Sequence, residues 1–431
     1  MNQSIVDKVN GTLFIDTHEH LIEESQRLAG PSPKVPLYYC DDWAYLYAHY
    51  ALDDLKIAGL SQTKAEQFMS RELSPIDKWD LVAPYWPQFS NTGYAKAALI
   101  SIKQLYGEDE VNARTVERIT VKLRAGVKKG FYYSILKDVA RVESCQVNSL
   151  DSTFRETEYP DLLFQDLSTL PLSTDLNLEQ MRQTTGLPIN NLDDFYQVID
   201  WHFETYGQSA IATKNQSAYA RRLDYLDVSR EDAAGFFSNY VKNPQQIQQS
   251  ELKAIQDHLF RYCVNRATHY QLPVKLHTGY FAGTGYMPLA NVSQNLKDLC
   301  PILQSFPETK FVLMHITYPY QDELIALAKH YPNVYVDLCW AWIVNPAATV
   351  RFVQEFLTAV PSNKLLTFGG DYTAVENVVG HATIARQGLS LALSNLIADG
   401  WVTEREELSL VTPLMHDNAW SLFRMPEKIR R

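Results

Sequence analysis

Two histidines one residue apart follow an apolar run near the start of the chain. Residues 14–20 read FIDTHEH. Alternate side chains of a strand point to the same side, so we expect His18 and His20 to face one way and Glu19 to point away. Two neutral imidazoles placed in this way can bind one divalent metal ion. A His-x-His pair is a weak signal alone, so the rest of the chain must supply the context.

Three later apolar runs also end in a residue that can bind a metal or move a proton. They read VKLHTG, FVLMH and LLTFGGD, and place His277, His315 and Asp371 at strand ends. Barrel enzymes build their active sites at the C-terminal ends of their strands. Taken singly, His315 could be a hydrogen-bonded core histidine and Asp371 a turn or helix cap. Together with the His-x-His pair, the strand ends favour one metal site.

The elements that would position these residues alternate short apolar runs with longer helical patterns. This alternation is typical of βα units and a parallel sheet. Helices are predicted over 192–206, 249–270, 291–305, 321–331, 347–359, 376–399 and 403–423, with helix-start signals at Asn291 and Thr403. Eight strands are predicted, over 12–18, 140–148, 161–167, 209–214, 273–277, 310–315, 334–338 and 365–370.

The segment 29–139 breaks this alternation between the first and second predicted strands. Its patterns predict helices over 44–60, 63–70, 94–106 and 112–125. We therefore expect an α/β protein, a single (β/α)8 barrel of the TIM type spanning 1–431. Residues 29–139 are expected to form a mostly helical insertion over one barrel mouth.

Composition narrows the function classes. The chain has 431 residues, 39 Lys and Arg against 50 Asp and Glu, and no basic block, so a nucleic-acid partner is not expected. No apolar run reaches 18 residues and the polar N-terminus lacks a secretory signal, so neither a membrane span nor secretion is expected. The five scattered cysteines are typical of reduced thiols in a cytoplasmic protein. A homo-oligomer is compatible with the sequence.

The chain resembles the amidohydrolase superfamily, and within it the amidohydrolase-related subgroup. The order of His-x-His, strand-end His, strand-end His and strand-end Asp is that of the family. The chain is similar to the amidohydrolase-like part of nodulin/glutamine-synthetase-like proteins, and more distantly to uronate isomerase. The carrying motifs are KLHTGY at 275–280, VLMHITYPY at 312–320, NVYVD at 333–337 and FGGD at 368–371.

The resemblance implies a role for each strand-end residue. His18, His20 and Asp371 would hold a divalent metal, expected to be zinc, with His277 as a further ligand. Such an ion acidifies its water and polarises a carbonyl. Asp371 would also move the proton of that water, and His315 would donate to the carbonyl or the developing oxyanion.

The resemblance leaves Lys214 with two roles. A carbamylated lysine at this strand end bridges two metals in binuclear relatives, so one ion or two are expected. A free Lys214 would instead bind a substrate carboxylate, or be a solvated strand-end lysine. Substrate contacts are also predicted for Arg221, Tyr318 and Trp340, although an exposed helix face for Arg221 and core packing for the aromatic residues are alternatives.

The function expected first is hydrolysis of an amide or ester bond in a small molecule, which can carry a carboxylate. One alternative is aldose–ketose isomerisation, as in uronate isomerases. The Asp371-Tyr372-Thr373 sequence departs from the Asp-Trp-Arg of those enzymes and weakens this alternative. Non-oxidative decarboxylation on the same site is another, and a non-catalytic binding protein a third. The intact strand-end set argues against the binding protein.

Overall fold

The protein is a closed barrel of parallel strands. The computed structural model describes residues 1–285 and 287–425. Its strands form a sheet in the order β1-β2-β3 and a second in the order β4 to β9, all paired in parallel. Their bounds are β1 Phe14–Glu19, β2 Val142–Val147, β3 Leu163–Gln165, β4 Leu167–Ser168, β5 Thr213–Asn215, β6 Val274–Leu276, β7 Phe311–Met314, β8 Val334–Asp337 and β9 Leu365–Leu366.

Two seams join the sheets into one barrel. The strands β3 and β4 are one chain segment interrupted at Asp166, whose amide donates to Val147 O at 2.8 Å. At the other seam, Thr17 N of β1 donates to Phe368 O, just beyond β9, at 3.0 Å. Counting β3 and β4 as one strand gives the eight barrel positions that the sequence predicts. The (β/α)8 fold is confirmed.

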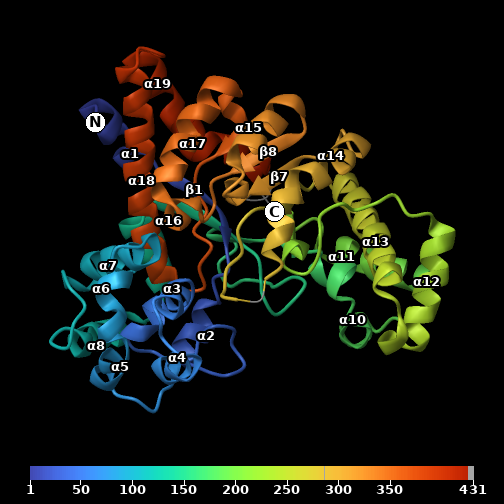
Figure 1. The fold of residues 1–431 in the computed structure, drawn as a ribbon, viewed down its shortest axis with the longest axis horizontal. Helices are drawn as coiled ribbons and strands as arrows, with labels where there is room; N and C mark the ends of the chain where they lie inside the picture. The colour runs from blue at the N-terminus through green and yellow to red at the C-terminus, as the bar shows by residue number, and fades with distance from the viewer. Residues whose placement is uncertain (286, 426–431) are drawn as a thin grey trace.

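Helices surround the barrel and return the chain to the start of each strand (Figure 1). The predicted helix before β5 is observed as α11, Leu192–Tyr206, and that before β6 as α13, Gln249–His269. The predicted start at Thr403 is correct, because its side chain caps α19 in a reciprocal capping box with Glu406. The other helices of this layer are α1 Gln3–Gly11, α10 Leu178–Thr185, α12 Arg230–Lys242, α14 Asn295–Ser305, α15 Gln321–His330, α16 Ala341–Val344, α17 Pro346–Ala359, α18 Val375–Ala398, α19 Glu404–Thr412 and α20 Asn418–Leu422.

Three helix predictions need correction. The predicted helix 44–60 is observed as a 3-10 turn, Trp43–Tyr47, followed by α3, Ala51–Ile57. The helix-start signal at Asn291 is wrong, because that residue lies in a 3-10 turn, Leu289–Gln294, and α14 begins only at Asn295. The predicted helix 403–423 is observed as α19, a π-helical turn and α20. Within residues 1–285 and 287–425, the structure has no helix that is both long and apolar enough to cross a membrane.

The chain between β1 and β2 is helical, as predicted, and gathers on one side of the barrel (Figure 1, lower left). Its aromatic residues make a second apolar core, centred on Trp43 and Tyr47. Tyr50 and Trp340 join this core to the barrel mouth, with ring centroids 4.9 Å apart. The helices are α2 Glu24–Ala29, α3 Ala51–Ile57, α4 Gln62–Met69, α5 Pro75–Val82, α6 Trp86–Phe89, α7 Gly93–Tyr106, α8 Val116–Gly126 and α9 Phe131–Tyr133.

Candidate metal centre

His18, His20 and Asp371 converge at the C-terminal ends of the first and last barrel strands. The Nε2 atoms of His18 and His20 each lie 3.3 Å from Asp371 Oδ1. All three residues offer ligand atoms that lie within 4.8 Å of one another. Two imidazoles and a carboxylate are donors that zinc prefers, so this set fits the metal that the resemblance implies.

The backbone around Asp371 holds its carboxylate in place. Asp371 has a positive φ of 62°, which side chains adopt at a cost. Its amide donates to His18 O at 2.9 Å, and its carbonyl accepts from the Tyr50 hydroxyl at 2.6 Å. Gly370 is required beside it, because a Cβ there would lie 1.9 Å from Glu19 Oε1. Glu19 Oε2 also accepts from Tyr372 N at 2.6 Å, so this side chain supports the segment that carries Asp371.

Backbone carbonyls fix the tautomers of three histidines. His20 Nδ1 lies 2.7 Å from Asn148 O, and His315 Nδ1 lies 3.0 Å from Cys339 O. His277 Nε2 lies 2.9 Å from Tyr280 O. In each ring the nitrogen that faces the carbonyl must carry the proton, which leaves the other nitrogen with a lone pair. Such contacts orient metal-binding imidazoles.

Burial keeps these imidazoles neutral. Loss of solvation lowers the pKa of His20 and of His277 well below the ordinary value, and lowers that of His315 to about 3. Burial opposes ionisation of Asp371, but the hydrogen bond with His18 holds the pKa of this carboxyl well below its usual range. The site thus combines a carboxylate anion with neutral ring nitrogens, the protonation states that metal binding needs.

His315 has a ligand atom within 4.8 Å of one on Asp371, and His277 lines the same cavity as His20 and Asp371. The His277 and His315 rings are 4.4 Å apart.

The lone pair on His315 Nε2 affects the role of this residue, because a nitrogen without a proton accepts hydrogen bonds. The predicted donation from His315 to an oxyanion requires the other tautomer, which the contact with Cys339 O disfavours.

Lys214 stands inside the centre and is not a solvated lysine. It is 2% exposed, and its Nζ lies 3.0 Å from His18 Nε2. Burial lowers the pKa of Lys214, while the Asp371 charge opposes this effect. Both a carbamylated bridge and a substrate contact remain open to a lysine in this position.

A buried ion pair supports the strand that carries His18 and His20. Lys275 Nζ lies 2.9 Å from each carboxylate oxygen of Asp166 and donates to Thr17 O at 2.8 Å. Neither side chain of the pair is exposed. Lys275 therefore ties β6 to β1 and to the β3–β4 segment directly below the ligands.

A cavity of about 240 Å³ opens onto the centre. His20, Lys214, His277 and Asp371 line it. Sequence reasoning missed several lining residues, because they come from the helical insertion and from loops that follow strands. These are His49, Tyr50, Leu150, Leu170, Asp175, Gln216, Tyr219, Ala220 and Ala282.

Tyr219 is the missed residue with the clearest chemistry. Its ring packs 4.6 Å from that of His277, and its hydroxyl accepts a hydrogen bond from Ala282 N at 3.0 Å. Burial raises its pKa, so the hydroxyl keeps its proton. That proton can be donated into the cavity.

The predicted substrate contacts Arg221, Tyr318 and Trp340 are not among the described residues that line this cavity. Arg221 is buried, not on an exposed helix face, and its guanidinium is paired with Asp257 and Asp224. The Tyr318 hydroxyl accepts from Asn345 Nδ2 at 3.1 Å. Trp340 is 1% exposed and packs its ring edge-on to His315, 5.4 Å away. Trp340 therefore supports the ring of His315 by packing against it.

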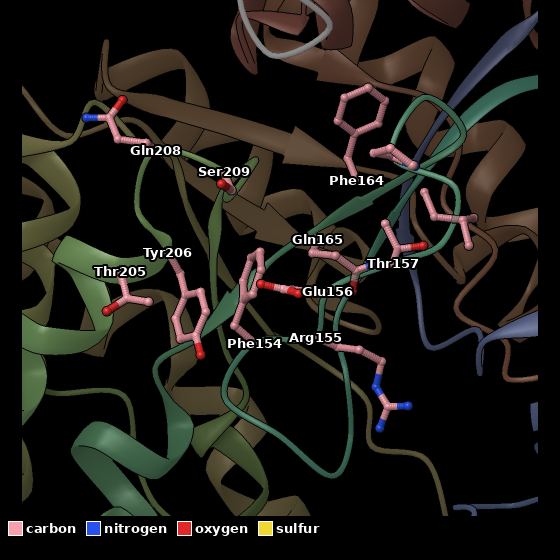
Figure 2. Close-up of a pocket in the computed structure, with 12 residues that line it drawn as sticks. Phe154, Arg155, Glu156, Thr157, Phe164, Gln165, Thr205, Tyr206, Gln208 and Ser209 are labelled. Atoms are coloured by element: carbon pink, nitrogen blue, oxygen red, sulfur yellow. The ribbon is translucent and has the colours of Figure 1, made fainter. Parts of the chain in front are cut away.

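A separate pocket of about 440 Å³ lies between the loop after β2 and the end of α11 (Figure 2). Its aromatic wall is the stacked pair Phe154 and Tyr206, with ring centroids 4.6 Å apart. It shares no lining residue with the cavity at the metal centre. No histidine or cysteine is among the described residues that line it.

Comparisons with known proteins show what this chain is similar to. The amidohydrolase family model matches residues 246–422. The protein fluG of Emericella nidulans is 25% identical over 230 residues, which cover 51% of this chain and 26% of fluG. The match thus spans about a quarter of the length of that curated relative.

Three solved structures match nearly the whole chain. Uronate isomerase from Thermotoga maritima has a TM-score of 0.75 at 16% identity, covering 98% of both chains. Glucuronate isomerase from Caulobacter crescentus has 0.76 at 16% identity, covering 98% of this chain and 93% of its own. A candidate metal-dependent hydrolase from Lactobacillus casei has 0.68 at 15% identity, covering 99% of both. The resemblance to the amidohydrolase superfamily, with a distant similarity to uronate isomerase, is confirmed.

Proposed function

We propose that this protein is a metal-dependent hydrolase that cleaves an amide or ester bond of a small molecule, which can carry a carboxylate. The observation that carries the proposal is the placement of Asp371 Oδ1 at 3.3 Å from both His18 Nε2 and His20 Nε2, at the wall of a cavity. A proton acceptor, metal donors and a space for substrate meet there.

The donor set supports zinc as the metal, held by His18, His20 and Asp371 with His277 as a further ligand. When bound, the ion would supply an acidified water and polarise the scissile carbonyl. Asp371, ionised in the folded protein, accepts the proton of the attacking water and returns it to the leaving group.

The cavity provides two donors for the negative charge that develops on the carbonyl oxygen. Lys214 Nζ and the Tyr219 hydroxyl both line it. We assign this stabilising role to them in place of His315, because His315 Nε2 carries a lone pair. Lys214 alternatively binds a substrate carboxylate, since it is the cation among the lining residues.

Aldose–ketose isomerisation is the second candidate. The structures named uronate isomerase and glucuronate isomerase match this chain along nearly its whole length, which favours this candidate. The residues after Asp371 count against it, since Tyr372 and Thr373 depart from the Asp-Trp-Arg pattern that the resemblance to uronate isomerases implies. The five free thiols, four of them buried, support the reducing cytoplasm as the location.

The zinc-loaded enzyme should be assayed on N-acyl amino acids, on small carboxylate esters and on uronates. Turnover of an amide or ester, lost in His18→Ala and kept in the surface control His330→Ala, supports the hydrolase. Turnover confined to uronates would replace it with the isomerase. Activity on an amide that survives both His18→Ala and Asp371→Asn would show that the assigned site is wrong.

A further inference from the structure

We propose that Cys339 is a thiolate ligand of a second metal position, completed by His315 and shared with the first position through Asp371. This inference rests on the metal centre of the proposed function and adds a ligand that the family resemblance does not assign. It makes the centre binuclear, with one position that prefers thiophilic ions.

The geometry of the three residues carries the inference. One ligand atom from each of His315, Cys339 and Asp371 lies within 4.8 Å of the other two. Ligand bonds to zinc are about 2.0 Å to nitrogen and about 2.3 Å to sulfur, so a modest inward movement of the side chains would bring all three onto one ion. The residues are 2%, 0% and 5% exposed, respectively. Burial at this level keeps competing water away.

His315 supplies the second, independent observation. Its Nδ1 is held by Cys339 O at 3.0 Å, while its Nε2 is buried and has no hydrogen-bond partner among the described residues. A buried polar atom without a partner is costly and calls for an explanation. A metal ion at this nitrogen explains it. The contact between His315 Nδ1 and Cys339 O also holds His315 next to the residue whose thiol would bind the same ion.

The backbone around Cys339 is built to hold the thiol in this place. Cys339 N donates to Asp337 Oδ1 at 2.9 Å, and Trp340 N donates to Gly369 O at 2.9 Å. A Cβ at Gly369 would lie 2.8 Å from Cys339 Cβ and 2.9 Å from Sγ. The glycine therefore makes room for the sulfur directly beside the segment that carries Asp371.

The chemistry of the position follows from its donors. When a divalent ion binds, the Cys339 S–H bond breaks, the sulfur lone pair forms the bond to the ion, and one proton passes to solvent. Sulfur favours zinc, cobalt and cadmium over magnesium and manganese. The first position has only nitrogen and oxygen donors, so the two positions should differ in metal preference.

Cobalt(II) titration of the metal-free full-length protein tests the inference, read by near-ultraviolet and visible absorption with bound cobalt measured by elemental analysis. The expected result is two cobalt ions per chain, with a thiolate-to-cobalt charge-transfer band that grows with the second. Cys339→Ser should lose this band and bind one ion. The matched control Cys263→Ser, a buried thiol on α13, should keep both. If Cys339→Ser does not fold, His315→Asn should lose the band and the second ion in the same way.

Different results would overturn the Cys339 ligand and the metal-dependent function. One cobalt per chain with visible bands but no thiolate band would overturn the role of Cys339 and leave the first metal position standing. A thiolate band that survives in Cys339→Ser would also overturn it. No cobalt bound at any concentration would overturn the metal-dependent function and this inference together.

Discussion

Replacing Lys275 by methionine should destabilise the fold severely, because it leaves a charge unpaired in the barrel. Lys275 Nζ lies 2.9 Å from both oxygens of Asp166, and neither side chain is exposed. Breaking a buried pair from one side costs about 3–5 kcal/mol, since the remaining charge has no water to solvate it. Thr17 O would also lose its partner. The measurement is the free energy of unfolding in urea, followed by circular dichroism.

The double variant Lys275→Met with Asp166→Leu separates charge burial from packing. It should recover part of the lost stability, because apolar pairs of similar volume often replace buried ion pairs at little cost. The matched control is Lys103→Met, whose partner Asp109 lies 2.7 Å away with side chains 66% and 74% exposed. That change should cost no more than about 1 kcal/mol. Equal losses of unfolding free energy in Lys275→Met and Lys103→Met would show that burial does not determine the cost of breaking the ion pair.

Three further substitutions test a buried carboxyl group, the glycine beside Asp371 and the hydroxyl in the cavity. Burial raises the pKa of Glu407 to about 7 from 4.5, so the folded state keeps a proton that the unfolded chain releases and wild-type stability falls as pH rises across that window. The free energy of unfolding of Glu407→Gln in urea should therefore rise relative to that of the wild type between pH 5 and pH 8. A difference between the two that does not change with pH would contradict this. Gly370→Ala should lose stability and metal by pushing against Glu19 Oε1, 1.9 Å from the new Cβ, whereas Gly126→Ala, with open space, should lose neither. Tyr219→Phe should keep its metal but lose about 10²–10³ in kcat if the hydroxyl stabilises the oxyanion; an unchanged kcat would remove it from that role.

The barrel strands and most of the flanking helices could be predicted from the sequence because local patterns specify them. The runs that form β6, β7 and β9 are short, apolar and bounded by turn residues. The helix α11 has the predicted bounds because Asn191 caps its first turn and its apolar positions repeat at helical spacing. The helix α12 was missed. It lies at the periphery and buries only Ala233 and Phe237, so its apolar pattern is weak.

The placement of the strand-end residues could be predicted because a strand's direction and period determine where its last residue points. His18, His20 and Asp371 came together as expected for that reason. Tyr219 and His49 could not be found in this way, because tertiary packing of the loop and of the helical insertion brings them to the cavity. The surroundings of Arg221 could not be predicted for the same reason. Its partner Asp257 lies on α13, and no local pattern shows that contact.

The most direct test of the metal centre is the amount of metal bound per chain, measured by elemental analysis of protein purified without chelator and then equilibrated with zinc. We expect at least one tightly bound ion in the wild type and in the surface control His330→Ala. We expect loss of that ion in His18→Ala, while circular dichroism shows the fold intact. A wild-type protein that binds no zinc, or a His18→Ala variant that binds as much as the wild type, would contradict the central claim.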